Sequence, residues 1–199
     1  GEEFPYRKVR QVYEDSKGLI WISTYEEGII QYNGEKFNQI TTDEGLADNT
    51  ILGTVEGDDG SMWIATYGGV SRYYEGEVEN FTIQEGLPNN AVMMVIKDNV
   101  GRIWASTFGG IAWFDGLKFQ SITTEDGLPN RVCYFIHQSK DGAFWIGTNN
   151  GVVKFDAELF LSDNPNEKEQ SFQLITKEQG LVSDETNLGA VYEDSNGHL

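Results

Sequence analysis

The sequence predicts an all-β fold built from four-stranded antiparallel β-propeller blades. Three observations lead to this prediction. The chain repeats itself roughly every 41 residues, it contains 23 Gly among its 199 residues together with 13% aromatic residues, and it shows no sustained apolar period of 3.6 residues. Evenly spaced glycine and aromatic residues are typical of all-β repeats, whereas a 3.6-residue period would indicate helices. We therefore expect almost no helix.

A tryptophan marks each repeat. Each has a Gly three positions before it and a Thr three positions after it, and the spacings are 42, 41 and 41 residues between Trp21, Trp63, Trp104 and Trp145. A Gly-Leu pair follows each unit, beginning at Gly45, Gly86, Gly127 and Gly180. So many coincidences at one period indicate a true internal repeat.

Each unit divides into four short segments rich in β-branched and aromatic residues, which we label strands A to D. In the third unit they are residues 92–98, 102–107, 111–115 and 118–123, separated by Gly or by Asn/Asp-Gly turns. Four strands in roughly 41–50 residues is the size of a propeller blade. An open meander array and a β-solenoid are the alternatives, although solenoid repeats are usually shorter. We expect blades at residues 9–42, 51–84, 92–124 and 132–177, then one further strand at 187–194.

Charge and cysteine content exclude several classes of protein. The 32 acidic and 14 basic residues give a formal net charge of −18. Such a chain is repelled by phosphate backbones and anionic lipids, so we expect it to bind neither nucleic acid nor membranes by itself. Cys133 is the single cysteine, which excludes an internal disulfide and a cysteine-based metal site.

Several motifs together resemble a known family. Residues 98–107 carry Asp-x-x-Gly-x-x-Trp-x-x-Thr and residues 86–90 carry Gly-Leu-Pro-x-Asn, with an aromatic-Asp/Asn-Gly turn and Phe-x-x-Ile-Thr between such segments. The combination resembles the two-component regulator propeller repeat over essentially the whole chain. Two units depart from the motif, with Gly57 and Ser139 in place of Asp, and Ala47 replaces the loop proline.

The resemblance implies a non-catalytic, periplasmic sensor module of a hybrid two-component signalling protein that responds to glycans. In such proteins an immunoglobulin-like domain, a membrane helix and a histidine kinase follow the propellers. None of these parts is in this sequence, so membrane attachment is expected only through other parts of a parent protein. A propeller lyase or hydrolase that acts on polysaccharides, and a purely structural interaction module, are the alternatives.

Both ends of the chain carry the same strand of the repeat. Residues 191–197 repeat residues 12–18 nearly letter for letter. A ring closed within one chain needs complementary ends, so we expect an open arc of four blades plus one strand, belonging to a longer protein. Because such an arc exposes the apolar faces of its terminal blades, we also expect it to self-associate through exposed blade edges.

Few residues are suited to catalysis. His137 and the nearby Tyr134 are the candidates that an enzyme would use, and Cys133 occupies a strand position that Val or Ile fills in other units. The acidic turns lack the alternating oxygen ligands of a calcium loop, and ordinary Asx turns explain them. We therefore expect no catalytic residue, no metal and no cofactor.

One face of the arc is the better candidate for ligand binding. Because the strands alternate in direction, the B–C and D–A loops emerge together, and they combine aromatic rings with amides and a guanidinium. These groups suit sugars, whose apolar faces stack on rings and whose hydroxyls need hydrogen-bond partners. Rings that pack between blades and Asn residues that hold turns are the alternative interpretation. The candidate ligand-binding residues are Tyr25, Glu26, Tyr67, Phe108, Asn149, Asn49, Asn90, Asn130 and Arg131.

The fourth unit carries an insertion at residues 156–170. The segment is polar and has turn-forming residues at its centre, which stretches the C–D connection. We interpret it either as a surface loop without a function or as an element that docks a neighbouring domain.

Overall fold

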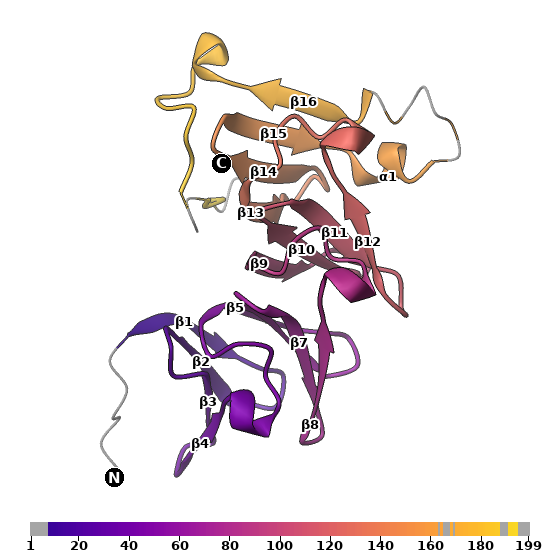
Figure 1. Cartoon of the computed structure of the whole chain (residues 1–199). Helices are drawn as coiled ribbons and strands as arrows, with labels where there is room; N and C mark the ends of the chain where they lie inside the picture. Colours follow the sequence, from indigo (N-terminus) through magenta and orange to yellow (C-terminus); the bar gives the residue numbers. More distant parts are fainter. Residues whose placement is uncertain (1–7, 163, 165–167, 169, 188–190, 195–199) are drawn as a thin grey trace.

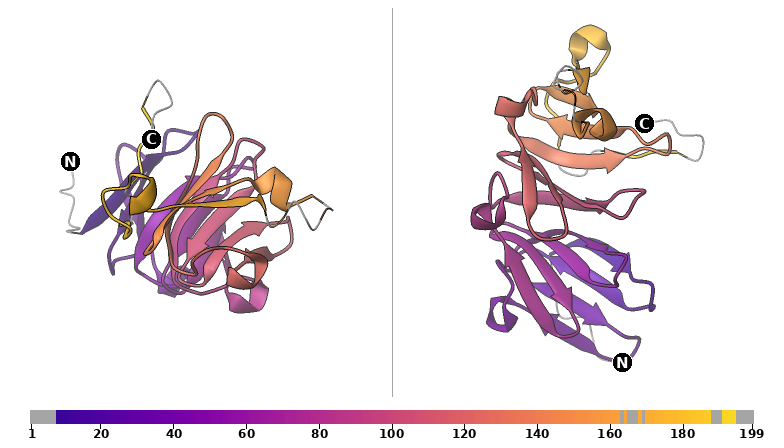
Figure 2. Two further views of the ribbon diagram at one scale, coloured as in Figure 1. Left: turned by 90° about the horizontal axis from the view of Figure 1, so that it is seen from above. Right: turned by 90° about the vertical axis from the view of Figure 1, so that its right-hand side faces the viewer.

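The predicted all-β propeller architecture is confirmed. The computed structural model describes residues 8–162, 164, 168, 170–187 and 191–194, and it contains four antiparallel sheets of four strands each. Figure 1 shows the sheets stacked one on another from blade 1, near the N-terminus, to blade 4. The views in Figure 2 show the same open stack from above and from the side.

Within each blade the strands follow one another in sequence order, as expected for a meander joined by short turns. Blade 1 contains β1 (Val9–Glu14), β2 (Ile20–Thr24), β3 (Ile29–Tyr32) and β4 (Phe37–Ile40), and blade 2 contains β5 (Ile51–Glu56), β6 (Met62–Thr66), β7 (Gly69–Tyr74) and β8 (Glu77–Phe81). Blade 3 contains β9 (Val92–Lys97), β10 (Ile103–Thr107), β11 (Gly110–Phe114) and β12 (Phe119–Ile122), and blade 4 contains β13 (Cys133–Gln138), β14 (Phe144–Thr148), β15 (Gly151–Phe155) and β16 (Phe172–Ile175).

The core lies between the blades. Trp63 of blade 2 packs on Phe114 of blade 3, with ring centroids 4.8 Å apart. Trp104 of blade 3 packs in the same way on Phe144 of blade 4, at 4.9 Å. Blades 1, 2 and 3 therefore bury their repeat tryptophan against the next blade, and the stacking of sheets provides the hydrophobic burial that one isolated sheet lacks.

A carboxylate holds the A–B turn to the tryptophan that follows it. In blade 3, Oδ1 of Asp98 accepts hydrogen bonds from the backbone N–H groups of Val100 and Arg102, and Oδ2 accepts one from the Trp104 indole at 2.9 Å. Asp15 makes the equivalent bonds in blade 1. The Asp-x-x-Gly-x-x-Trp motif is thus a structural unit, because a buried indole N–H needs a partner.

Blades 2 and 4 lack this Asp but carry an Asp two residues later in the same turn. In blade 2, Asp59 accepts hydrogen bonds from the backbone N–H and Oγ–H of Ser61 and pairs with Arg72 at 2.5 Å. In blade 4, Asp141 accepts from the N–H of Ala143, and Ser139 Oγ accepts the indole N–H of Trp145 at 3.2 Å. The turn therefore keeps an Asx hydrogen bond although its position changes.

Each D–A loop begins with a capped 3₁₀ turn. These turns are η1 (Thr42–Glu44), η2 (Ile83–Glu85), η3 (Thr124–Asp126) and η4 (Lys177–Gln179). A Thr caps every one in a capping box, and a left-handed Gly ends it. The Leu after that Gly is buried in the first three loops, at Leu46, Leu87 and Leu128. The Ile-Thr and Gly-Leu motifs of the repeat are the two ends of this turn.

Hydrogen bonds also join successive blades, at a contact that we call the inter-blade clamp. It links the last residue of strand A in one blade to the second residue of the A–B turn in the blade before it. Between blades 1 and 2, Glu56 accepts from Ser16 N–H at 2.8 Å and from Ser16 Oγ at 2.6 Å. The partners between blades 2 and 3 are Lys97 and Asp58, at 2.7 Å, and those between blades 3 and 4 are Gln138 and Asn99, at 2.7 Å.

The insertion is partly helical. Asp156 caps α1 (Ala157–Phe160), and Phe160 packs on Phe155 and Phe172 of the fourth sheet. The segment therefore extends the blade 4 core, which polarity alone did not indicate. Of the further strand expected at 187–194, residues 188–190 lie outside the described residues, and residues 191–194 form no strand although they contact blade 4.

We expect Asp98→Ala to destabilise the protein by about 2–4 kcal/mol, because it leaves the buried indole N–H of Trp104 and the turn N–H groups without their acceptor. Denaturant unfolding measures this loss. Asp43→Ala, in the exposed first turn of η1, is the control and should change stability by about 0.5 kcal/mol or less. Equal effects of the two substitutions would contradict the structural role of Asp98.

The carboxyl of Asp59 should make stability depend on pH in the acid range. Burial alone would raise its pKa, but hydrogen bonds from Ser61 and Arg72 outweigh burial and lower the pKa to about 2. Since the folded-state pKa is below the unfolded value of 3.8, this contribution is complete above pH 3.8 and is lost as the pH falls towards 2. Asp59→Asn should flatten the dependence of unfolding free energy on pH in this window. An unchanged slope in Asp59→Asn would refute the assignment.

Candidate functional site

The B–C turns and the D–A loops are joined by backbone hydrogen bonds on one face of the stack. The N–H of Gly28, in the B–C turn of blade 1, donates to the carbonyl of Asn49 in the following D–A loop at 2.8 Å. A Cβ on Gly68 or Gly109 would meet the carbonyl oxygen of Ala47 or Pro88 at 2.3 and 2.4 Å. Glycine is therefore required here by close approach of the two loops. We call this surface the loop face.

Three predicted aromatic residues occupy the same position at the B–C tips of blades 1, 2 and 3. Tyr67 and Phe108 are 41% and 38% exposed, and Tyr25 is half-buried. The Phe108 ring meets Tyr134 of blade 4 edge-on at 6.1 Å, and the Lys8 ammonium lies 5.1 Å from the Tyr25 ring. The rings are thus partly packed, and each also retains solvent-accessible surface.

The three predicted loop asparagines hold their own loops. Asn49 and Asn90 accept hydrogen bonds from the first N–H of η1 and η2, at 2.8 and 2.9 Å, and Asn130 accepts from the N–H of Val132 at 2.9 Å. Their amide oxygens are therefore already engaged in turn structure.

Some loop-face residues depart from the repeat pattern and are exposed to solvent. Arg131 is exposed at the position that Asn49 and Asn90 fill in earlier loops, and a guanidinium cannot accept the capping bond. Asn149 is exposed at the B–C tip of blade 4. Glu26 has a positive φ of 76° and pairs with Lys8 at 3.1 Å; both side chains are exposed, so the pair adds little stability.

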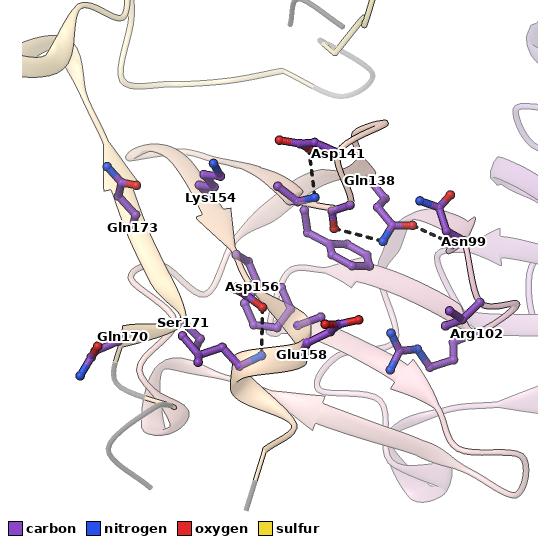
Figure 3. Close-up of a pocket in the computed structure, with 17 residues that line it drawn as sticks. Asn99, Arg102, Gln138, Asp141, Lys154, Asp156, Glu158, Gln170, Ser171 and Gln173 are labelled. Carbon is purple, nitrogen blue, oxygen red and sulfur yellow. Dashed lines mark hydrogen bonds between the residues drawn. The ribbon is translucent and has the colours of Figure 1, made fainter. Parts of the chain in front are cut away.

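The structure also contains a pocket that sequence analysis did not predict. It has a volume of about 540 Å³ and lies on the opposite face, between the A–B turns of blades 3 and 4 and the insertion. Figure 3 shows Asn99 and Arg102 from blade 3 facing Gln138, Lys154 and Gln173 from blade 4. Its lining also includes the buried residues Phe144, Phe155 and Ala157. The insertion at 156–170 was the signal for it, because this segment contributes one wall.

The polar groups of this pocket are of mixed charge. Ser139 Oγ–H and the Ala143 N–H donate hydrogen bonds that lower the pKa of the Asp141 carboxyl, and the nearby Lys154 ammonium favours the same direction. Arg102 is already paired with Asp98, at 2.6 Å. A neutral polar molecule fits this balance better than a strongly charged one.

The catalytic candidates are engaged elsewhere. Nε2 of His137 lies 3.1 Å from a carboxylate oxygen of Glu193, on the surface where residues 191–194 cover blade 4. Cys133 is buried, and burial raises the pKa of its thiol to about 12, so it is a poor nucleophile. Among the described residues no three His, Cys, Asp or Glu side chains converge as metal ligands, and no described helix is long and apolar enough to cross a membrane.

Comparisons with solved structures give matches to extracellular domains of two-component systems. The extracellular domain of the hybrid two-component system BT3049 from B. thetaiotaomicron superimposes with a TM-score of 0.81 and 25% identity, over 95% of this chain and 26% of that one. The corresponding domain of BT4673 from the same organism gives 0.65 and 22%, over 84% and 24%. The chain thus spans about a quarter of the length of either domain.

An enzyme shares the fold as well. Virginiamycin B lyase from Staphylococcus aureus gives a TM-score of 0.62 at 20% identity, over 76% of this chain and 53% of that one. Similarity at this level shows the propeller fold alone. No curated protein sequence matches the chain.

A family comparison identifies the repeat itself. The family described as "Two component regulator propeller" matches residues 3–26, 45–68 and 86–109. The second and third matched segments run from the D–A loop through strands A and B to the B–C tip, and all three contain the Asp-x-x-Gly-x-x-Trp turn or its variant. Three segments of the chain thus match the two-component regulator propeller repeat, and the chain as a whole is similar in structure to part of the extracellular domain of a B. thetaiotaomicron hybrid two-component system.

Proposed function

We propose that this chain is a non-catalytic, periplasmic sensor module that binds an oligosaccharide on its loop face and belongs to a hybrid two-component signalling protein. The location and the signalling role rest on the similarity to extracellular domains of such systems. Binding would be transmitted by movement of the propeller relative to neighbouring parts of a parent chain, through which any membrane attachment would also occur.

The exposed aromatic row on the loop face is the observation that carries the glycan proposal. Tyr67 and Phe108 stand at the same tip position in adjacent blades, and Tyr25 continues the row in blade 1. Stacked sheets lie about 10 Å apart, so a chain of sugar residues can reach successive rings. Apolar sugar faces stack on such rings, and the polar edges then need hydrogen-bond partners.

The remaining exposed residues supply those partners. Asn149 offers an amide and Arg131 a guanidinium, and Glu26 is positioned by its strained backbone at the blade 1 tip. Asn49, Asn90 and Asn130 keep amide groups on this face although their oxygens hold turns. Because the net charge is −18, a neutral oligosaccharide is favoured over an acidic one.

Two alternative functions would use other features. A polysaccharide lyase or hydrolase would need a general base on the loop face. His137 instead lies near the A–B turn end of β13, where it pairs with Glu193. A purely structural module would use the exposed blade edges to bind protein. Self-association through those edges is compatible with ligand binding on the loop face, since β1 carries the exposed Val9 and Val12 on a separate surface.

Titration calorimetry against a panel of neutral oligosaccharides tests the proposal. We expect Tyr67→Ala and Phe108→Ala each to weaken binding by about fivefold, since a ring contact contributes roughly 1 kcal/mol. Tyr74→Ala is a matched control, because Tyr74 is also 41% exposed but lies at the C–D end of its strand, on the opposite face. It should change affinity less than about twofold.

A second control separates the two candidate surfaces. Lys154→Ala alters the pocket between blades 3 and 4 and leaves the loop face intact. If Lys154→Ala abolishes binding while Tyr67→Ala does not, the ligand occupies the pocket and the loop-face proposal is wrong. Turnover of an oligosaccharide, detected by chromatography of the incubated sugar, would contradict the non-catalytic proposal and favour the enzyme alternative.

A further inference from the structure

The outer side of blade 4 binds a short segment from the same chain. Nε2 of His137 and the backbone N–H of Lys140 lie 3.1 Å from the two carboxylate oxygens of Glu193, and Lys140 Nζ donates to the carbonyl of Asp194 at 2.8 Å. The Lys140–Glu193 bond is an inter-blade clamp, with Lys140 at the turn position of Ser16 and Asn99. Residues 191–194 thus contact blade 4 at the position that strand A of a following blade would occupy, although they form no strand themselves.

The same five residues occur once more in the sequence. Residues 12–16 and 191–195 are both Val-Tyr-Glu-Asp-Ser. The first copy forms the end of β1 and the following turn, where Val12 is 61% exposed and Glu14 is also exposed. The equivalent strand A residues Val95 and Ile136 are 4% and 0% exposed. β1 therefore presents a complete strand A surface that no described residue covers.

We propose that blade 1 of one copy docks on blade 4 of a second copy, with β1 replacing residues 191–194. Glu14 then takes the place of Glu193 and accepts from the backbone N–H of Lys140 and from His137. Val12 is buried as Val95 and Ile136 are. The contact continues the blade stack across two molecules, and its charges are complementary, since Glu14 meets Lys140 and His137.

Such an interface is head to tail, so it uses two different surfaces of each copy. Assemblies of this kind close into rings where the rotation permits and otherwise extend. Two copies supply eight blades, which lies within the range of closed propellers. The inference gives the proposed self-association a defined interface, and it is independent of any ligand on the loop face.

The segment 191–194 competes for the same surface, which gives the two identical glutamates opposite roles. Glu14→Lys should block docking, because the new cation would face Lys140 and His137. Glu193→Lys should promote docking, because it weakens the internal competitor and frees blade 4. We expect Glu193→Lys to lower the dissociation constant for self-association by about tenfold, and Glu14→Lys to raise it by at least about tenfold.

Light scattering coupled to gel filtration, over a concentration series of the full chain, measures these constants. Glu35→Lys, in the exposed C–D turn of blade 1, is the charge-matched control and should leave self-association unchanged. A monomer at every concentration, in both the unmodified chain and Glu193→Lys, would overturn the proposal. So would equal weakening by Glu14→Lys and Glu193→Lys.

A mixing experiment tests the head-to-tail direction. Lys140→Glu blocks the blade 4 surface and Glu14→Lys blocks the blade 1 surface, so each variant alone should be monomeric. In an equimolar mixture, the unchanged blade 1 of Lys140→Glu can dock on the unchanged blade 4 of Glu14→Lys. The two altered surfaces also carry opposite charges, because the new lysine at position 14 would face the new glutamate at position 140. We expect the mixture to recover the mass of the unmodified assembly. A mixture that stays monomeric would show that association, where present, uses like surfaces and not β1 on blade 4.

Discussion

In blades 1 and 3, the hydrogen bond between a turn carboxylate and a buried indole is the interaction on which the A–B turn and the packing against the next blade depend. Trp104 is fully buried between blades 3 and 4, and its N–H has to find an acceptor there. Asp98 supplies it, and its other oxygen holds the two N–H groups that shape the A–B turn. One carboxylate therefore fixes the turn, the register of strands A and B, and the ring that binds the next blade. Burial of this carboxyl would raise its pKa, yet the donors around it lower the pKa on balance, so it stays ionised.

Stacking of blades through that ring has a functional consequence. The sheets and their clamps form a continuous stack, and in blades 1, 3 and 4 the B–C and D–A loops are joined by backbone hydrogen bonds at one end of the sheet. A ligand that contacts several tips at once meets groups that are already positioned, which lowers the entropic cost of binding. Because each blade contacts its neighbours along the stack, cooperativity is expected to run along the array, as in other repeat proteins.

Much of this fold was predictable from the sequence, because the repeat determines it. The positions of the strands, the left-handed glycines of the turns and the burial of Cys133 all follow from local residue types and their spacing. The shift of the turn carboxylate to Asp59 and Asp141 was not predicted, since the compensation appears only when the hydrogen-bond partners are in place. The pocket was missed for a related reason. Polar residues around 156–170 conceal Phe160, whose packing against the sheet brings the insertion over blade 4.

Hydrogen exchange at a protein concentration that keeps the chain monomeric tests most directly whether blade-on-blade packing holds the structure together. Strands β1, β5 and β9 have the same position in the repeat and the same antiparallel partner in their sheets, but β5 and β9 are covered by a blade on both sides and β1 on one. The account predicts that amides of β5 and β9 exchange at least about tenfold more slowly than those of β1. Equal protection of the three strands would show that each sheet is stable alone and would contradict it.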